Sequence, residues 1–213
     1  MQHLTLMQVL DALSKRRYGV FRGIEVCSFY YSTTERFYID VLDEGGSKHN
    51  VQVNFVFQPL RGETPNTMGI YQRLPLGGAT IWIRGDLEED ICKWDVLRHE
   101  LGHLLQHYAG TVKTQEVEKS LFEKYIEGRA RGRYVGTSPK EMGAEWTRVL
   151  LGGMRFEDIF WATEPNAYGE CTAYIRALMS TMRKREKIPE PPFEEYEDEF
   201  EWERQQDADG DYV

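Results

Sequence analysis

A stripe of large apolar side chains between residues 94 and 108 sets the strongest limit on how this 213-residue chain folds. Its members recur every three or four residues, which is the period of an α-helix that buries one face. Asp86 and Glu89 precede the stripe with the spacing of a capping box, and Gly110 follows it. We therefore predict an amphipathic helix over residues 86–108. Its buried stripe would consist of Trp94, Leu97, Leu101, Leu104, Leu105 and Tyr108.

Strand-like and helical patterns divide the rest of the chain. Strands are predicted where β-branched and aromatic residues are dense, over residues 24–32, 36–42, 50–57 and 79–84. Further helices are predicted over residues 4–16, 115–127, 138–152 and 165–187. Residues 58–77 contain repeated prolines and glycines and are predicted to form a long loop. These elements predict an α+β fold, with a small mixed or antiparallel sheet packed on helices.

The negative charge of the chain is concentrated at its C-terminal end. Residues 189–213 hold eleven acidic residues and one arginine, a net charge of −10, while the whole chain carries −9. Residues 1–188 therefore carry +1 and lack the basic excess typical of nucleic-acid-binding domains. We predict one folded domain, residues 1–188, followed by an acidic and disordered segment, residues 189–213. Aromatic side chains in that segment make it a candidate contact for a protein partner.

Cysteine usage and apolar runs indicate the cellular compartment. Cys27, Cys92 and Cys171 are widely spaced and form no C-x-x-C pair, so neither a disulfide framework nor a four-cysteine zinc site is predicted. No apolar run approaches the roughly 20 residues that a membrane span needs. The first residues lack the pattern of a signal peptide. We therefore expect a cytoplasmic protein with reduced cysteines and no membrane partner.

The predicted helix contains a pair of histidines with metal-ligand spacing. Residues 99–103 read His-Glu-Leu-Gly-His, and positions four apart lie on one helix face with Cβ atoms roughly 5–6 Å apart. His99 and His103 can therefore bind one zinc ion, which still requires a third protein ligand. Glu100 is placed to take a proton from water that the metal activates. Gly102 lowers the stability of the helix by roughly 1 kcal/mol relative to Ala. Because glycine has no side chain, another helix can approach closely at this position.

This motif and the strand before it resemble the zincin metallopeptidases. The α+β layout resembles the gluzincin branch and its small single-domain members, with the specific likeness confined to residues 79–109. The resemblance implies that His99 and His103 bind Zn²⁺, that Glu100 is the general base, and that the substrate is a peptide or protein. The metzincin branch is disfavoured, because Gln106 and Ala109 stand where it has glycine and histidine.

The resemblance also implies a third zinc ligand, a glutamate from a later helix followed three residues on by a small residue. Glu170, followed by an alanine at 173, and Glu141, followed by one at 144, both fit, and Glu145 is a further candidate. We favour Glu170, because a carboxylate among small and apolar neighbours is costly to bury without a metal partner. The alanines beside it would pack against Gly102. Glu141 and Glu145 share a polar stripe, although Glu145 would suit the acid that the family carries four residues after the ligand.

Two further sets of residues are candidates for the site. Tyr174 stands four residues after Glu170, where the family has an acid, and is predicted to support the ligands or to stabilise an oxyanion. Ile81, Trp82 and Ile83 lie on a presumed edge strand, to which an extended peptide would add through main-chain hydrogen bonds. Their side chains are expected to belong mainly to the core.

The predicted function is zinc-dependent hydrolysis of peptide bonds, most simply as an endopeptidase. The main alternative is an inactive protein of the same fold that binds or supports partners in a larger assembly. A regulatory protease with one protein target would share the chemistry and differ in substrate. A hydrolase of non-peptide amides is compatible with the same motif. Metal content and turnover on peptides distinguish the enzyme from the binding protein.

Overall fold

The computed structural model describes residues 3–21, 25–29, 32–57, 67–75, 77–87, 93–127, 134–153 and 165–188. These residues form a mixed sheet and five α-helices, so the predicted α+β class is confirmed. The acidic segment, residues 189–213, lies outside the described residues. None of the described helices combines the length and the apolar character that crossing a membrane requires.

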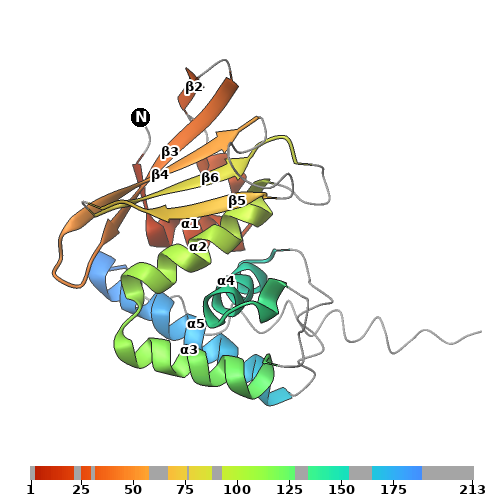
Figure 1. Ribbon diagram of the computed structural model, residues 1–213. Coiled ribbons are helices and arrows are strands. Elements are labelled where there is room, and N and C mark those ends of the chain that lie inside the picture. Colours follow the sequence, from red (N-terminus) through yellow and green to blue (C-terminus); the bar gives the residue numbers. More distant parts are fainter. Residues whose placement is uncertain are drawn as a thin grey trace, which may run out of the picture.

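Six strands form one mixed sheet (Figure 1). Their order is β1-β3-β4-β6-β5, and β2 pairs with β3. β4 runs antiparallel to β3 and parallel to β6, which in turn is antiparallel to β5. The bounds are β1 His3–Thr5, β2 Glu25–Phe29, β3 Ser32–Leu42, β4 Lys48–Val56, β5 Gly69–Arg73 and β6 Ala79–Arg84.

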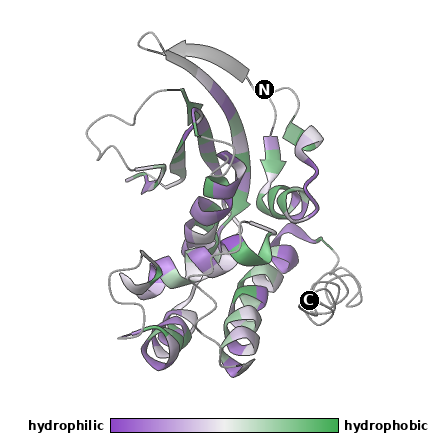
Figure 2. Ribbon diagram, turned by 90° about the vertical axis from the view of Figure 1, so that its right-hand side faces the viewer, coloured by the Kyte–Doolittle hydropathy of each residue, from purple (hydrophilic) through white to green (hydrophobic). Residues whose placement is uncertain are grey.

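The long strands bury one face and leave the other partly open to water. Val51, Val53 and Phe55 of β4 are fully buried and alternate with more polar positions. Hydrophilic and hydrophobic segments accordingly alternate along the long strands in Figure 2. The predicted strands 50–57 and 79–84 match β4 and β6 closely, because alternation of apolar and polar residues is a local property of the sequence. The predicted strand 36–42 lies within β3, which begins four residues earlier, at Ser32.

The strand β5 was not expected from the sequence. It falls inside the predicted loop 58–77, and that prediction is wrong for residues 69–73. Its five residues are exposed or only partly buried. Their sequence, Gly-Ile-Tyr-Gln-Arg, shows no alternation of apolar and polar side chains. Hydrogen bonding to β6 forms the strand nonetheless. Among the described strands, β5 is therefore the last one on this side of the sheet, and β6 lies between β4 and β5.

Five helices cover the sheet and pack on one another. In Figure 1, α1 and α2 lie against the sheet and α3 and α4 lie beyond α2, while α5 contacts the other four helices and also β3. The bounds are α1 Leu6–Ser14, α2 Lys93–Ala109, α3 Val112–Tyr125, α4 Pro139–Leu150 and α5 Pro165–Glu186, with short 3₁₀ turns η1 Tyr18–Phe21 and η3 Tyr134–Gly136.

Helix α2 contains the predicted apolar stripe and the sequence His-Glu-Leu-Gly-His. Leu97, Leu101, Leu104 and Leu105 are fully buried in the core, as their spacing predicts. The predicted start at Asp86 is wrong, because residues 86 and 87 are not helical. The Asp86 carboxylate instead pairs with the Arg84 guanidinium at 2.9 Å. Glu89, the predicted partner in the capping box, lies outside the described residues.

The close approach predicted at Gly102 is present, with α4 as the partner. A Cβ atom at position 102 would lie 2.5 Å from the Cα atom of Ala144 and 3.0 Å from its carbonyl oxygen. The alanines of α5, which we expected at this contact, are not the residues that meet it. The absence of a side chain at Gly102 therefore sets how near α4 lies to α2.

We expect Gly102→Ala to destabilise the protein by about 1–3 kcal/mol, although alanine is the better helix former. The new methyl group would meet backbone atoms of α4, which cannot move aside as a flexible side chain can. Gly169 of α5 is the matched control, because a Cβ atom there meets nothing within 4 Å. Gly169→Ala should stabilise by up to about 1 kcal/mol. Urea unfolding measures both, and a Gly102→Ala protein as stable as the parent would contradict the packing argument.

Candidate metal centre

Three side chains from two helices converge at the centre of the molecule. His99 and His103 extend from α2 and Glu141 from α4, and one potential ligand atom of each lies within 4.8 Å of the others. The Oε2 atom of Glu141 is 3.3 Å from Nε2 of His99 and 3.4 Å from Nε2 of His103. The two imidazole rings are nearly perpendicular, with centroids 4.9 Å apart. The described residues thus form a compact group that could hold a metal ion.

Local sequence explains why Glu141 reaches the histidines. Ser138 caps α4, and its side-chain oxygen accepts a hydrogen bond from the backbone N–H of Glu141 at 3.2 Å. Glu141 therefore lies in the first turn of α4. Gly102 lies between the two histidines in the sequence and lets this helix approach α2 closely. The Ser138 cap and the absence of a side chain at Gly102 together place the Glu141 carboxylate beside both imidazoles.

The donor set fits a zinc ion. Two imidazole nitrogens and one carboxylate oxygen are the protein ligands of His₂Glu catalytic zinc sites. The Oε2 atom of Glu141 is buried, and despite its short distances to the rings it makes no well-directed hydrogen bond to the described part of the chain. A cation between the three groups would satisfy that oxygen.

The structure does not bring Glu170, our favoured third ligand, to the histidines. Its carboxylate accepts hydrogen bonds from Lys124 Nζ at 2.9 Å and from the Tyr125 hydroxyl at 3.0 Å, and its side chain is 47% exposed. It lies between α3 and α5 rather than beside α2. We therefore replace Glu170 with Glu141 in the candidate ligand set.

The reason for this correction is the position of α4. The sequence pattern of its polar stripe suggested a face in contact with water, but α4 packs against both α2 and α5. The side chains of Glu141 and Glu145 are therefore only 22% and 7% exposed. Periodicity identifies a polar face, whereas the neighbouring helices decide whether that face is solvated.

Glu145 supports His99 from the side opposite Glu141. Its Oε1 atom lies 2.7 Å from Nδ1 of His99, which leaves Nε2 of the ring directed toward Glu141. Arg148 pairs with Glu145 at 3.5 Å and also with the buried carboxylate of Asp95. A carboxylate on the second ring nitrogen fixes the orientation of a ligand imidazole and raises its basicity. Glu145 therefore occupies the position predicted for a supporting acid four residues after Glu141.

The carboxylates make the site strongly attractive to positive charge. Burial opposes protonation of His99, but the carboxylates of Glu141 and Glu145 outweigh it and raise the pKa of His99 to about 10. Burial also acts on Glu141, yet the imidazoles of His103 and His99 hold its pKa well below the usual value. A divalent cation bound between these groups would compete with protons for the ring nitrogens and the carboxylate.

Glu100 lies against the edge strand β5. It is 5% exposed, and a Cβ atom at Gly69 would come within 2.5 Å of its Oε1 atom. Only glycine at position 69 therefore lets the carboxylate lie this close to the strand. Burial raises the pKa of Glu100 above that of an ordinary glutamate, with His99 and His103 opposing the shift. A raised pKa suits a group that must both accept and release a proton near neutral pH.

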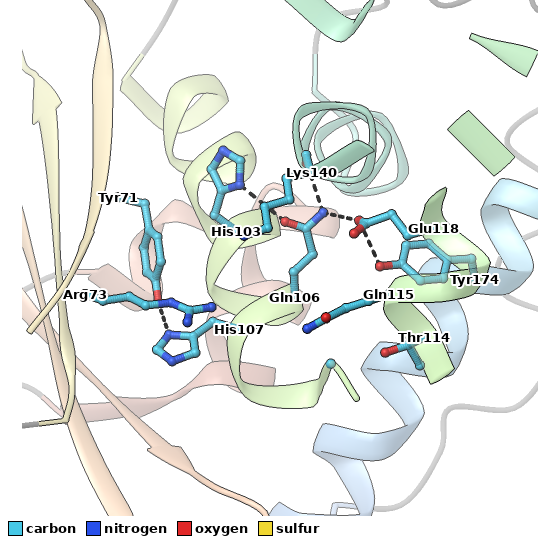
Figure 3. A pocket seen from close by; sticks show the side chains of 11 residues that line it. Tyr71, Arg73, His103, Gln106, His107, Thr114, Gln115, Glu118, Lys140 and Tyr174 are labelled. Atoms are coloured by element: carbon cyan, nitrogen blue, oxygen red, sulfur yellow. Dashed lines mark hydrogen bonds between the residues drawn. The ribbon is translucent and has the colours of Figure 1, made fainter. Parts of the chain in front are cut away.

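Tyr174 is linked to the site through other side chains. Its hydroxyl donates to Glu118 Oε1 at 2.9 Å, and the same oxygen accepts a hydrogen bond from Gln106 Nε2 at 2.5 Å. The Oε1 atom of Gln106 lies 3.3 Å from Nδ1 of His103 (Figure 3). This geometry favours the supporting role predicted for Tyr174 over contact with a reacting oxyanion. Sequence reasoning missed Gln106 and Glu118, although Gln106 follows His103 by three residues on the same helix face.

The structure corrects the role expected of residues 81–83. Ile81 and Ile83 are fully buried in the core, as their alternation suggested. Trp82 is partly exposed, but the backbone of β6 pairs with β4 on one side and β5 on the other. No further strand can add to β6, so Ile81, Trp82 and Ile83 do not form a peptide-binding edge. Among the described strands that edge belongs to β5.

A cavity of about 220 Å³ adjoins the metal group on the side of His103 (Figure 3). Tyr71 of β5 stacks on the His103 ring with centroids 6.2 Å apart, and its hydroxyl is hydrogen-bonded to His107. Burial, together with the nearby positive charge of Arg73, lowers the pKa of His107 to about 4. The lining comes from β5 and all helices except α1: Tyr71, Arg73, His103, Gln106, His107, Gly110, Thr114, Gln115, Glu118, Lys140 and Tyr174.

The candidate site thus combines three potential metal ligands, a buried glutamate beside an edge strand, and an adjoining cavity. Each part is formed by the described residues. Comparisons with protein-family models, with curated proteins and with solved structures give no match to this chain.

Proposed function

We propose that the protein is a zinc-dependent metallopeptidase with a zincin-type site, in which His99, His103 and Glu141 hold the metal. The observation that carries this proposal is the convergence of Glu141 on the two histidines of α2. Glu100, which directly follows His99 in the sequence, lies beside the strand edge where an extended substrate would bind. Ligands, base and binding edge are therefore within one small region.

Each side chain has a distinct task in this proposal. Zinc, when bound, would polarise the substrate carbonyl and lower the pKa of water. Glu100 accepts a proton from the attacking water on its carboxylate and passes it to the amide nitrogen of the leaving group as the C–N bond breaks. Glu145 holds the His99 ring in place through Nδ1. Gln106 supports His103 in the same way, with Glu118 and Tyr174 behind it.

The substrate would be an extended peptide alongside β5. In the described sheet β5 pairs only with β6, so the main-chain groups on its other side are available for β-augmentation. Gly69, the first residue of β5, is the residue against which Glu100 packs. A peptide bound there would pass close to the proposed base. This replaces the binding edge that we expected at β6.

Elemental mass spectrometry tests the metal, and peptide cleavage tests the activity. Full-length protein purified without an affinity tag should contain about one zinc per chain. It should cleave members of a peptide library, and a chelator should stop cleavage until zinc is added back. Absence of bound metal after zinc is supplied would contradict the site. A zinc-loaded protein that cleaves no peptide would contradict the activity and favour a binding or structural role.

A further inference from the structure

The cavity beside His103 carries an excess of positive charge. Arg73 reaches it from the end of β5 and Lys140 from the first turn of α4 (Figure 3). Neither cation forms an ion pair with a carboxylate in the part of the chain that the structure describes. Glu118 is the one acidic residue of the lining, and its Oε1 atom already accepts hydrogen bonds from Tyr174 and Gln106. The lining therefore contains two cationic side chains, Arg73 and Lys140, and one carboxylate, Glu118, which is already hydrogen-bonded within the protein.

The polar lining reinforces this preference for an anion. Thr114 and Gln115 lie in the first turn or so of α3, and Lys140 lies in the first turn of α4. The N-terminal ends of helices carry partial positive charge from the aligned peptide dipoles. The Gln115 amide points toward the cavity in Figure 3 and can donate to a bound oxygen. His107 contributes no charge of its own, since its lowered pKa leaves the imidazole neutral at pH 7.

The cavity is aligned with the proposed path of the substrate. Gly69, Tyr71 and Arg73 alternate along β5 and therefore lie on one face of the strand. Gly69 meets Glu100, and Tyr71 meets His103 and His107, so this face of β5 runs along α2. Positions 69 and 73 are about 13 Å apart on an extended strand. A side chain that enters the cavity would thus come from a residue within about four positions of the bond that faces Glu100.

We infer that this cavity is a specificity pocket for a carboxylate of the substrate, held by Arg73 and Lys140. The carboxylate belongs to an acidic side chain near the cleaved bond or to the C-terminal end of the peptide. The inference rests on the proposed function, because it names the class of peptide that the same site takes. Arg73 gives planar, two-pronged recognition of a carboxylate, and Lys140 gives a second charge.

Binding of blocked amino acids to the full-length protein tests the pocket without requiring hydrolysis. N-acetylglutamate N-methylamide carries the acidic side chain, N-acetylglutamine N-methylamide is its neutral counterpart, and N-acetylalanine carries a chain-end carboxylate. NMR titration should show one or both carboxylate probes binding about tenfold tighter than the neutral one. The resonances of Thr114 and Gln115 should move. Arg73→Gln and Lys140→Gln should each remove most of this difference.

Lys113→Gln is the matched control. Lys113 is an exposed lysine in the same first turn of α3 but does not line the cavity, so its removal should leave the preference unchanged. Equal affinity for acidic and neutral probes would overturn the pocket. A preference that survives in Arg73→Gln but disappears when zinc is stripped would place the carboxylate on the metal, and would also overturn it.

Cleavage of a peptide library by the zinc-loaded protein separates the two proposals. The pocket predicts that cleaved peptides share an acidic residue at one fixed position, or are cut near their C-terminal end. Arg73→Gln should reduce that selection, measured as the ratio of kcat/KM for acidic over neutral peptides, whereas Lys113→Gln should leave the ratio at the parent value. Cleavage with no acidic or chain-end selection would overturn the pocket and leave the proposed function standing. Absence of cleavage, with probe binding that depends on Arg73, would overturn the function and leave the pocket standing.

Discussion

Glu100→Gln is expected to leave zinc bound and to lower kcat/KM for peptide hydrolysis by about 10²–10⁴-fold. Glutamine keeps the size of the side chain and its packing against Gly69, where there is no room for a larger group. It loses the ability to accept the proton of the attacking water and to return it to the leaving amine. Glu100 is not among the three grouped ligands, so metal content should not change.

Turnover and zinc content are measured for each variant. Rates are compared on a peptide that the parent protein cleaves, and zinc is determined on the same preparations by elemental mass spectrometry. Glu116→Gln is the control, because Glu116 is an exposed glutamate of α3. It should behave as the parent in both assays. A Glu100→Gln protein that keeps its zinc and cleaves within tenfold of the parent rate would exclude Glu100 as the base.

The second large effect concerns the choice of the third ligand. Glu141→Ala should weaken zinc binding by more than the 10–100-fold typical of losing a group that only supports a ligand. It removes one of three donors and leaves His99 and His103 without the carboxylate that faces both. Binding of zinc to the folded state stabilises a protein by mass action, so the rise in Tm on adding zinc should also be lost.

Glu170→Ala supplies the contrast, because Glu170 is the third ligand that the sequence pattern favours. Glu170 bonds to Lys124 and Tyr125 on an exposed part of α5, so its replacement should leave zinc affinity at the parent value. Competition with a chromophoric chelator measures affinity in both variants, and thermal unfolding with and without zinc measures the coupling. If Glu170→Ala loses zinc and Glu141→Ala retains it, the ligand set derived from the structure is wrong.

Local spacing along the chain was sufficient to predict several parts of this protein. The α+β class, the strands β3, β4 and β6, and the amphipathic character of α2 follow from periods of two and 3.6 residues. The closeness of His99 and His103 follows from the same period, because residues four apart lie on one face of any helix. These features depend on contacts within one element or between neighbours in sequence.

Contacts between elements that are distant in the sequence cannot be predicted from local spacing. Glu141 and Glu170 are both followed three residues on by an alanine, and only the packing of α4 against Gly102 places Glu141 beside the histidines. The edge strand β5 has too little apolar pattern to be predicted, and pairing with β6 forms it. Gln106 contacts His103 within α2 and donates a hydrogen bond to Glu118 of α3, a contact between helices that local spacing does not predict. Periodicity tells which face of an element is apolar or polar, but the partner that covers the face depends on how all the elements pack together.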